Sequence, residues 1–363
     1  MFYRALIAAA VASAFAAPAM ADVSISGYAE MDIYARTHQA SSQKDDGSSS
    51  SALGNETDLM LNFDGSDKLD NGNKLIWRVS QKVATPATAS WGSREAYIGL
   101  TGDWGTFRSG RVFAPSYLAL DQFQWGAGNL WEDYGANAVW FKEALAYSTP
   151  NFNGFGAQVA YDLGTRTSQG QTWAVDAIAT YNNKDQGLNL AGGYQQQKGL
   201  AALNQDDAFS SGGDTGAKQE FYFVQANWDI ARTGFTVRGG YKHNKWSDTN
   251  NSLGFGAGKV ENDQFLLAGA YAWDKSQLAL GWQDIVNSKV DGQKFNNANA
   301  NQFFGQYTYT MSKNTSAYLQ ARYMKFKDAD VRPFAAATWQ LDGVASSGTD
   351  NGARVLVGTW TGF

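Results

Sequence analysis

The chain of 363 residues contains no cysteine, only 5 prolines and only 2 histidines, His38 and His243. Without cysteine it can form no disulfide, no thiolate nucleophile and no cysteine-ligated metal site. Both histidines lie in or beside polar sequence, so we interpret them as solvated residues and not as ligands or bases. Neither is near a G-x-S-x-G motif, which disfavours a hydrolase. We therefore expect no enzyme activity, no cofactor and no metal site.

Long apolar runs are also lacking beyond the first residues. Arg4 is followed by the apolar stretch 5–17 and by the A-x-A sequence Ala19-Met20-Ala21. This pattern is typical of a secretory signal peptide, so we predict a leader at residues 1–21 and one domain at residues 22–363. The leader's about 13 apolar residues are too few for a spanning helix, and no later segment approaches about 18, which excludes a helical membrane protein.

Positive charge is in deficit. There are 34 acidic and 29 basic residues, and removal of Arg4 with the leader changes the net charge from −5 to 28 − 34 = −6. Nucleic acid is therefore not the expected partner, because it requires a basic face. The mean hydropathy of −0.39 is that of a polar chain, yet 14% of the residues are aromatic and 39 are glycine. A soluble all-β protein and a transmembrane β-barrel both fit this composition.

What the sequence does contain is alternation of period two, which predicts strands. In residues 72–83, for example, Leu75, Trp77 and Val79 alternate with polar residues such as Arg78. No segment of helical length with a 3.6-residue period follows the leader. The predicted strands are 22–35, 54–65, 72–83, 91–102, 105–112, 141–150, 155–163, 172–182, 187–197, 216–230, 234–245, 260–273, 276–287, 301–310, 315–327 and 351–363.

The connections between these sixteen strands alternate between long and short. Every strand then reverses direction, and an even number of strands with one looped end is the plan of a transmembrane barrel. A soluble sandwich, such as a secreted adhesin, is the alternative, but it does not require this rhythm. The long connections are 36–53, 84–90, 113–140, 164–171, 198–215, 246–259, 288–300 and 328–350.

Aromatic residues expected to form girdles at the membrane interfaces are Trp77, Tyr97, Tyr181, Trp228, Trp273, Tyr309 and Tyr323.

Residues 93–111, SREAYIGLTGDWGTFRSGR, place three arginines within strand-like sequence. The stretch resembles the Gram-negative general porin family in its pattern S-R-x-A-Y-x-G-L-x-G, a turn, and G-T-x-R-x-G-R. Residues 147–161, residues 22–35 and the terminal Phe363 resemble the same family. The resemblance implies a 16-stranded antiparallel barrel in the outer membrane, assembled as a homotrimer with the early strands and connection 84–90 at the contact.

The resemblance also implies that the third long connection, residues 113–140, folds into the lumen and constricts it. Its acidic candidates Asp121, Glu132 and Asp133 would face a ladder of basic residues on the wall. The basic candidates are Arg78, Arg94, Arg108, Arg111 and Lys142. The alternative is that these bases are ordinary solvated lumen residues.

Alternation places Arg94 opposite Tyr97 and Gly99, and Arg108 opposite Phe107, so we expect both arginines to face the lumen. Arg108 and Arg111 differ by three positions and cannot both do so on a regular strand. Either Gly110 marks a bulge or Arg111 already belongs to the loop. Met60 and Ser148 stand where the family often carries arginine, which tilts the expected preference weakly towards cations.

We expect a water-filled channel for the passive diffusion of ions and small hydrophilic solutes, with outer-membrane lipid around it. The alternative is a sugar-selective channel, in which Trp125, Trp131 and Trp140 of the constricting loop stack on sugar rings. The competing interpretation of these three tryptophans is that they pack the loop against the wall.

Overall fold

A computed structural model describes residues 22–37, 52–85, 91–123, 125, 130–164, 166–167, 170–199, 216–248, 258–329, 331–334 and 350–363. The predicted leader, His38 and most of connection 84–90 lie outside these ranges. Sixteen strands form a closed antiparallel barrel, as the sequence predicted. They are β1 (Asp22–Arg36), β2 (Ala52–Lys68), β3 (Lys74–Thr85), β4 (Ala96–Gly102), β5 (Gly105–Phe113), β6 (Trp140–Ser148), β7 (Phe155–Asp162), β10 (Trp173–Asn183), β11 (Leu188–Lys198), β12 (Lys218–Asp229), β13 (Phe235–Ser247), β14 (Lys259–Trp273), β15 (Ser276–Val290), β17 (Ala300–Thr310), β18 (Thr315–Phe326) and β19 (Asn351–Gly362).

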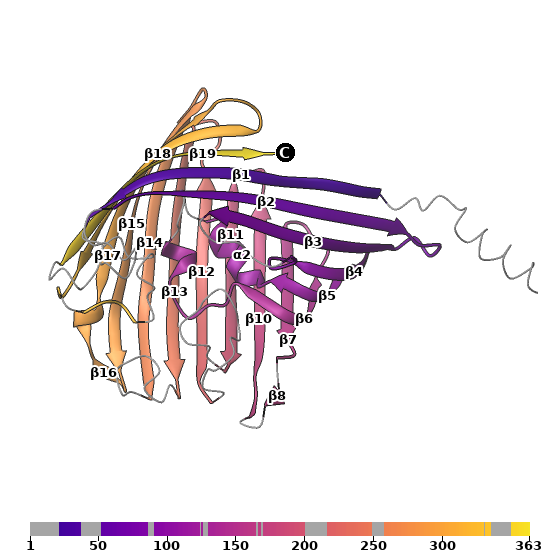
Figure 1. The fold of residues 1–363 in the computed structure, drawn as a ribbon, viewed down its shortest axis with the longest axis horizontal. Helices are drawn as coiled ribbons and strands as arrows, with labels where there is room; N and C mark the ends of the chain where they lie inside the picture. Colours follow the sequence, from indigo (N-terminus) through magenta and orange to yellow (C-terminus); the bar gives the residue numbers. More distant parts are fainter. Residues whose placement is uncertain are drawn as a thin grey trace, which may run out of the picture.

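The barrel closes between its first and last strands. β1 pairs with β2 on one side and with β19 on the other, in a register that runs from Tyr28 opposite Gly362 to Arg36 opposite Arg354. In Figure 1, β1 to β3 cross the direction of β10 to β13, because strands must tilt for a sheet to close on itself. The two-residue strands β8 (Arg166–Thr167), β9 (Gly170–Gln171) and β16 (Gln293–Lys294) lie outside the sixteen. Closure leaves the barrel without a free sheet edge.

Side chains alternate between an apolar outer face and a polar inner face. On β18, Leu319 is 52% exposed, whereas Gln320 and Arg322 on the opposite face of the strand are 2% and 4% exposed. A soluble sandwich would place these residues the other way round, so the pattern indicates lipid outside and polar groups inside. Trp228, Trp273, Tyr309 and Tyr323 also point outward, as predicted for girdle residues.

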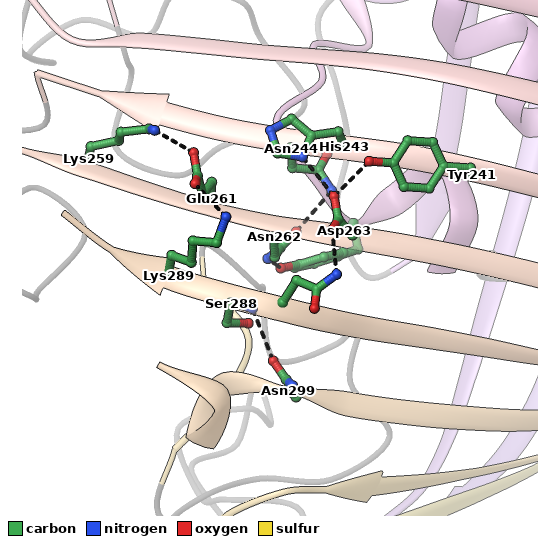
Figure 2. Close-up of polar contacts among 12 residues, drawn as sticks. Tyr241, His243, Asn244, Lys259, Glu261, Asn262, Asp263, Ser288, Lys289 and Asn299 are labelled. Atoms are coloured by element: carbon green, nitrogen blue, oxygen red, sulfur yellow. Dashed lines mark hydrogen bonds and ion pairs between the residues drawn. The ribbon is translucent and has the colours of Figure 1, made fainter. Parts of the chain in front are cut away.

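Figure 2 shows polar contacts near the long-connection end of β13 to β15, and among them Asp263 has the same strand parity as the outward Phe265. Asp263 accepts hydrogen bonds from the Tyr241 hydroxyl (2.8 Å) and Asn287 (2.7 Å), and lies 2.7 Å from His243 Nδ1. The prediction that His243 is simply solvated is therefore wrong, since its half-buried ring is paired with a carboxylate. Glu261 is bound by Lys259 and Lys289 in the same region.

Three local predictions differ from the structure. β4 begins at Ala96 and not at residue 91, because residues 91–95 form turns and bends, with Gly92 at a φ of +72°. Ile98 is outward and 52% exposed, so Tyr97 points into the lumen and is not a girdle residue. The alternation argument for Arg94 fails for the same reason, since the regular strand does not reach it. No helix in the described ranges is long and apolar enough to cross a membrane.

Candidate functional site

The connection between β5 and β6 enters the barrel and carries two short helices, α2 (Pro115–Asp121) and α3 (Leu130–Asp133). We call residues 114–139 the inward loop. Figure 1 shows α2 between the crossing walls. Pro115 suits the first turn of α2, where its missing N–H is not needed. Such a short helix has no strong periodic signal in the sequence, so sequence analysis did not find it.

The first helix is fixed to the wall through Asp176 on β10, whose side chain is fully buried. The backbone amide and the hydroxyl of Ser116 both donate to the Asp176 carboxylate, at 3.0 and 2.6 Å. Gln195 on β11 donates to the same carboxylate at 2.8 Å, and its amide oxygen accepts from the Ala138 backbone amide. A single carboxylate thus holds α2 against the wall, while its neighbour Gln195 secures the end of the inward loop.

A second anchor lies on β13 and β14. The fully buried Lys242 donates to the carbonyl oxygens of Trp131 (2.6 Å) and Tyr134 (2.5 Å), which α3 leaves without helical partners. Asn262 donates to the Tyr134 hydroxyl, and Asn244 donates to Asn262 at 3.1 Å. Asn244 and Asn262 are labelled in Figure 2. The charge of Lys242 is therefore used to hold the loop and is turned away from the open lumen.

The tryptophans of the inward loop pack it against the wall. Trp131 is fully buried in an apolar cluster with Phe123 and Phe221, and its indole N–H donates to Gln225 at 3.1 Å. Trp125 packs against the same cluster, with the Arg238 guanidinium 3.9 Å from its ring centre. Trp131 is buried and one face of Trp125 is covered by Arg238, so the alternative of an aromatic sugar track is not supported.

Trp140, at the start of β6, brings two of the predicted arginines together. The guanidinium carbons of Arg94 and Arg111 lie 5.1 and 5.3 Å from the centre of its ring. Arg111 Nε also donates to the Arg94 carbonyl oxygen at 3.1 Å. Arginine is stabilised by the electron-rich face of an aromatic ring, so Trp140 supports positive charge at the base of the inward loop.

Gly110 is the reason why Arg111 reaches this position. The pairing of β5 with β6 shifts between Gly110 and Val112, and Gly110 has a φ of +130°. A side chain there would lie 2.3 Å from the Ala96 carbonyl oxygen. The first of the two predicted alternatives, a bulge at Gly110, is confirmed. Arg108, before the bulge, lies over the lumen-facing Tyr97 ring at 5.5 Å and donates to Ser148.

The other predicted residues are dispersed. Arg78 is bound between Asp64, at 2.6 Å, and Glu95, at 3.1 Å, so its charge is compensated on the wall itself. Lys142 is half-buried on β6. Asp121 is exposed at the end of α2, whereas Glu132 is 7% exposed within α3. The side chain of Asp133 lies outside the described part of the chain.

Tyr28 on β1 lies within reach of the charges of Arg94 and Asp121. Sequence analysis missed the residues that hold the loop, Asp176 and Lys242. Their inward parity was readable from the strand pattern, but their loop partners lie 60 to 111 positions away. No group of three or more His, Asp or Glu residues that could hold a metal occurs within the described ranges.

The model of the Gram-negative porins matches residues 8–329. The chain belongs to the Gram-negative porin family. The major outer membrane protein P.IB of Neisseria meningitidis serogroup B is 26% identical over 338 residues, which cover 89% of this chain and 93% of that protein. The P.IA protein of strain H44/76 of the same species is 28% identical over 187 residues, 44% of this chain and 46% of that protein.

Solved structures share the fold of this porin. An anion-selective porin from Comamonas acidovorans has a TM-score of 0.71 at 17% identity, covering 94% of this chain and 100% of that one. The trimer form of OmpT from Vibrio cholerae has a TM-score of 0.67 at 13% identity, covering 94% and 99%. The protein is thus an outer-membrane porin, a water-filled channel for the passive diffusion of ions and small hydrophilic solutes.

Proposed function

We propose that this porin is constricted by the inward loop and passes cations slightly better than anions. The observation that carries the proposal is the compensation of Arg78 by both Asp64 and Glu95. Lys82 is likewise paired with Asp58. Two of the wall bases therefore add no net positive charge to the lumen, although they stand on the wall where the family resemblance predicts a basic ladder.

Two lumen positions further support a thin basic ladder. Met60, on the inner face of β2, is 5% exposed and accepts a hydrogen bond from Ser80, and Ser148 accepts one from Arg108. Neither contributes a charge. We assign Arg94, Arg108 and Arg111 to the constriction as positive groups, and Asp121 as an acidic group of the inward loop. Together with the net charge of −6, these charges give a weak preference for cations over anions and not a strict selectivity filter.

The test is the reversal potential of the purified full chain in planar bilayers under a salt gradient. A small potential of the sign set by cation flux is expected. Clear anion selectivity, as the name of the Comamonas porin states for that protein, would show that Arg94, Arg108 and Arg111 dominate. Swelling of liposomes in neutral sugars of increasing size would measure the width of the constriction independently of its charge.

We also propose that the porin is a homotrimer with β1 at the subunit contact. The outward residues Val23, Ile25, Met31 and Ile33 are 42 to 63% exposed in the single chain and form an apolar face with the small residue Ala29. OmpT, which has the same fold, has been solved in a trimer form. Unboiled samples should migrate as a heat-dissociable trimer, and a monomer in mild detergent by light scattering would contradict the proposal.

A further inference from the structure

A cluster of three oxygen atoms bridges the seam where the barrel closes. Glu30 and Asp32 lie on the lumen side of β1, and Tyr318 lies on the lumen side of β18, two strands away. The Tyr318 hydroxyl is 2.7 Å from Glu30 Oε1 and 2.6 Å from Asp32 Oδ1. Sequence analysis did not single out any of these residues, because the two carboxylates are separated from the tyrosine by 286 or more positions.

Gly358 on β19, the strand between, makes the approach possible. It pairs with Asp32 on one side and with Tyr318 on the other. A side-chain carbon at Gly358 would lie 2.0 Å from Asp32 Oδ1 and 2.4 Å from the Tyr318 ring. The tyrosine ring therefore crosses β19 over a position without a side chain. The contact between the three oxygens follows from the register in which β19 pairs with β1 and β18.

The number of protons in this cluster does not match the number of short contacts when both carboxylates are ionised. A phenol carries one proton and can donate it to one acceptor at a time. The second carboxylate oxygen would then face the phenol oxygen at hydrogen-bond distance with no proton between them. One additional proton on either carboxyl group satisfies both contacts, because that group then donates to the tyrosine oxygen while the tyrosine donates to the other.

We propose that Glu30, Asp32 and Tyr318 share one extra proton, and that the loss of this proton adds one negative charge to the lumen wall and increases the porin's preference for cations. Atoms and charge balance: the proton passes to water in the lumen, and the charge of the cluster changes from −1 to −2. The triad thereby acts as a determinant of ion specificity that depends on pH, with cation preference rising as pH rises.

The surrounding charges oppose one another. Glu56 and Asp58 on β2 stand opposite Asp32 and Glu30, and Asp58 is itself paired with Lys82. Arg354 on β19 brings a positive charge near the triad. Arg322 stands four residues beyond Tyr318 on the inner face of β18.

The triad is also connected to the constriction. Tyr28, two residues before Glu30 on the same face of β1, feels the charges of Glu30, Arg94 and Asp121 together. A unit change of charge at the triad therefore acts near Arg94 and Asp121, which we assign to the proposed constriction. This inference requires a conducting channel but not the proposed weak cation preference. The absolute reversal potential at one pH tests that preference, whereas its change with pH tests the triad.

The experiment is a series of reversal potentials under one salt gradient at pH values from about 3 to about 9, a range that begins below the ordinary pKa values of carboxyl groups, about 4, and ends well above them. The full chain is compared with Glu30→Gln and Asp32→Asn, in which an amide replaces one carboxyl group and can donate to the tyrosine oxygen without an extra proton. In the unmodified protein the cation-to-anion permeability ratio should rise about two-fold through the transition, the effect of one charge at roughly one Debye length. Both variants should lose this step.

Glu56→Gln is the matched control, because Glu56 is exposed and lies on β2 directly opposite Asp32 of β1 in the strand register. It removes one lumen carboxylate at the same height, so it should shift the permeability ratio at neutral and alkaline pH, where carboxyl groups are ionised, while keeping the step. Identical pH curves for the unmodified protein, Glu30→Gln and Asp32→Asn would overturn the proposal, as would loss of the step in Glu56→Gln. Should either amide variant fail to fold, Tyr318→Phe, which removes the shared oxygen, must also abolish the step.

Discussion

Ser116 and Asp176 are joined by two hydrogen bonds, one from the serine hydroxyl at 2.6 Å and one from its backbone amide at 3.0 Å. They lie 60 residues apart in the chain, and both are fully buried. The contact ties the first helix of the inward loop to β10 on the barrel wall. The position of α2 inside the barrel therefore depends on a contact in which the wall supplies the acceptor and the loop supplies the donors.

Replacement of Asp176 by alanine should release α2 and widen the channel. Each hydrogen bond to a charged group contributes about 1.5–3 kcal/mol, and the buried Ser116 amide would be left without an acceptor. We expect higher single-channel conductance and faster liposome swelling in large sugars. Ser116→Ala, which keeps the amide donor and loses only the hydroxyl, should show a smaller increase. An unchanged conductance in Asp176→Ala would mean that the remaining anchors suffice.

Replacement of Lys242 by methionine should loosen the second half of the inward loop. The carbonyl groups of Trp131 and Tyr134 would lose their donor, at a cost of about 1–3 kcal/mol for each buried group left unsatisfied. The expected result is faster cleavage of the loop by a protease that leaves the folded barrel intact. Lys245→Met is the control, because Lys245 lies three residues along the same strand, faces outward and pairs with Glu220. Equal cleavage rates in the two variants would contradict the role of Lys242.

Arg94→Gln should alter selectivity with little effect on folding, since Arg94 contributes a charge at Trp140 and no ion pair in the described structure. The cation preference should increase, and the increase should shrink in about 1 M salt, where the Debye length falls to about 3 Å. Reversal potentials at low and high salt measure both effects. Arg238 is not a suitable control, because it donates to the Phe123 carbonyl of the inward loop at 2.7 Å.

The appropriate control for Arg94 is Arg232→Gln, in the short turn between β12 and β13, where the residue is exposed. The same charge is removed there at a distance from the inward loop, so the reversal potential should hardly change. If both variants shift it equally, the net charge of the molecule and not the constriction sets selectivity. Failure of Arg94→Gln to form a barrel would instead make the stacking on Trp140 structural.

The position of β1 in the proposed trimer can be tested with single cysteines, because the chain has none of its own. Ile25→Cys and Leu280→Cys each place a thiol on an outward position, where the native side chains are 63% and 60% exposed in the single chain. A fluorophore at Leu280 on β15 should be quenched strongly by a quencher dissolved in the bilayer. A fluorophore at position 25 should be protected from the quencher by the neighbouring subunit. Equal quenching at the two positions would place the subunit contact away from β1.

The strand pattern of this porin could be predicted because alternation and connection length are local properties. A strand with lipid on one side and water on the other must change polarity at every residue, so β18 is evident from Leu319, Gln320 and Tyr323 alone. The bulge at Gly110 could be narrowed to two alternatives, since Arg108 and Arg111 cannot share a face on a regular strand. The alternation argument failed for Arg94, because residues 91–95 form turns and bends and the regular strand begins only at Ala96.

The sequence by itself determined the class of the molecule: sixteen strands, their direction and, on regular strands such as β18, which residues face lipid or lumen. Tertiary structure decided how the lumen residues are used. In the structure the charge of Arg78 is compensated by carboxylates, Lys242 holds the inward loop, and Trp131 is a buried anchor of that loop. The sequence predicted only that these residues are polar or aromatic groups inside the barrel. The reason is that strand parity fixes only the face from which a side chain projects. Which residue it contacts inside the closed barrel depends on the strand register and on the path of the inward loop. The contact of Tyr318 with Glu30 and Asp32 exists only because closure places β18 and β19 beside β1.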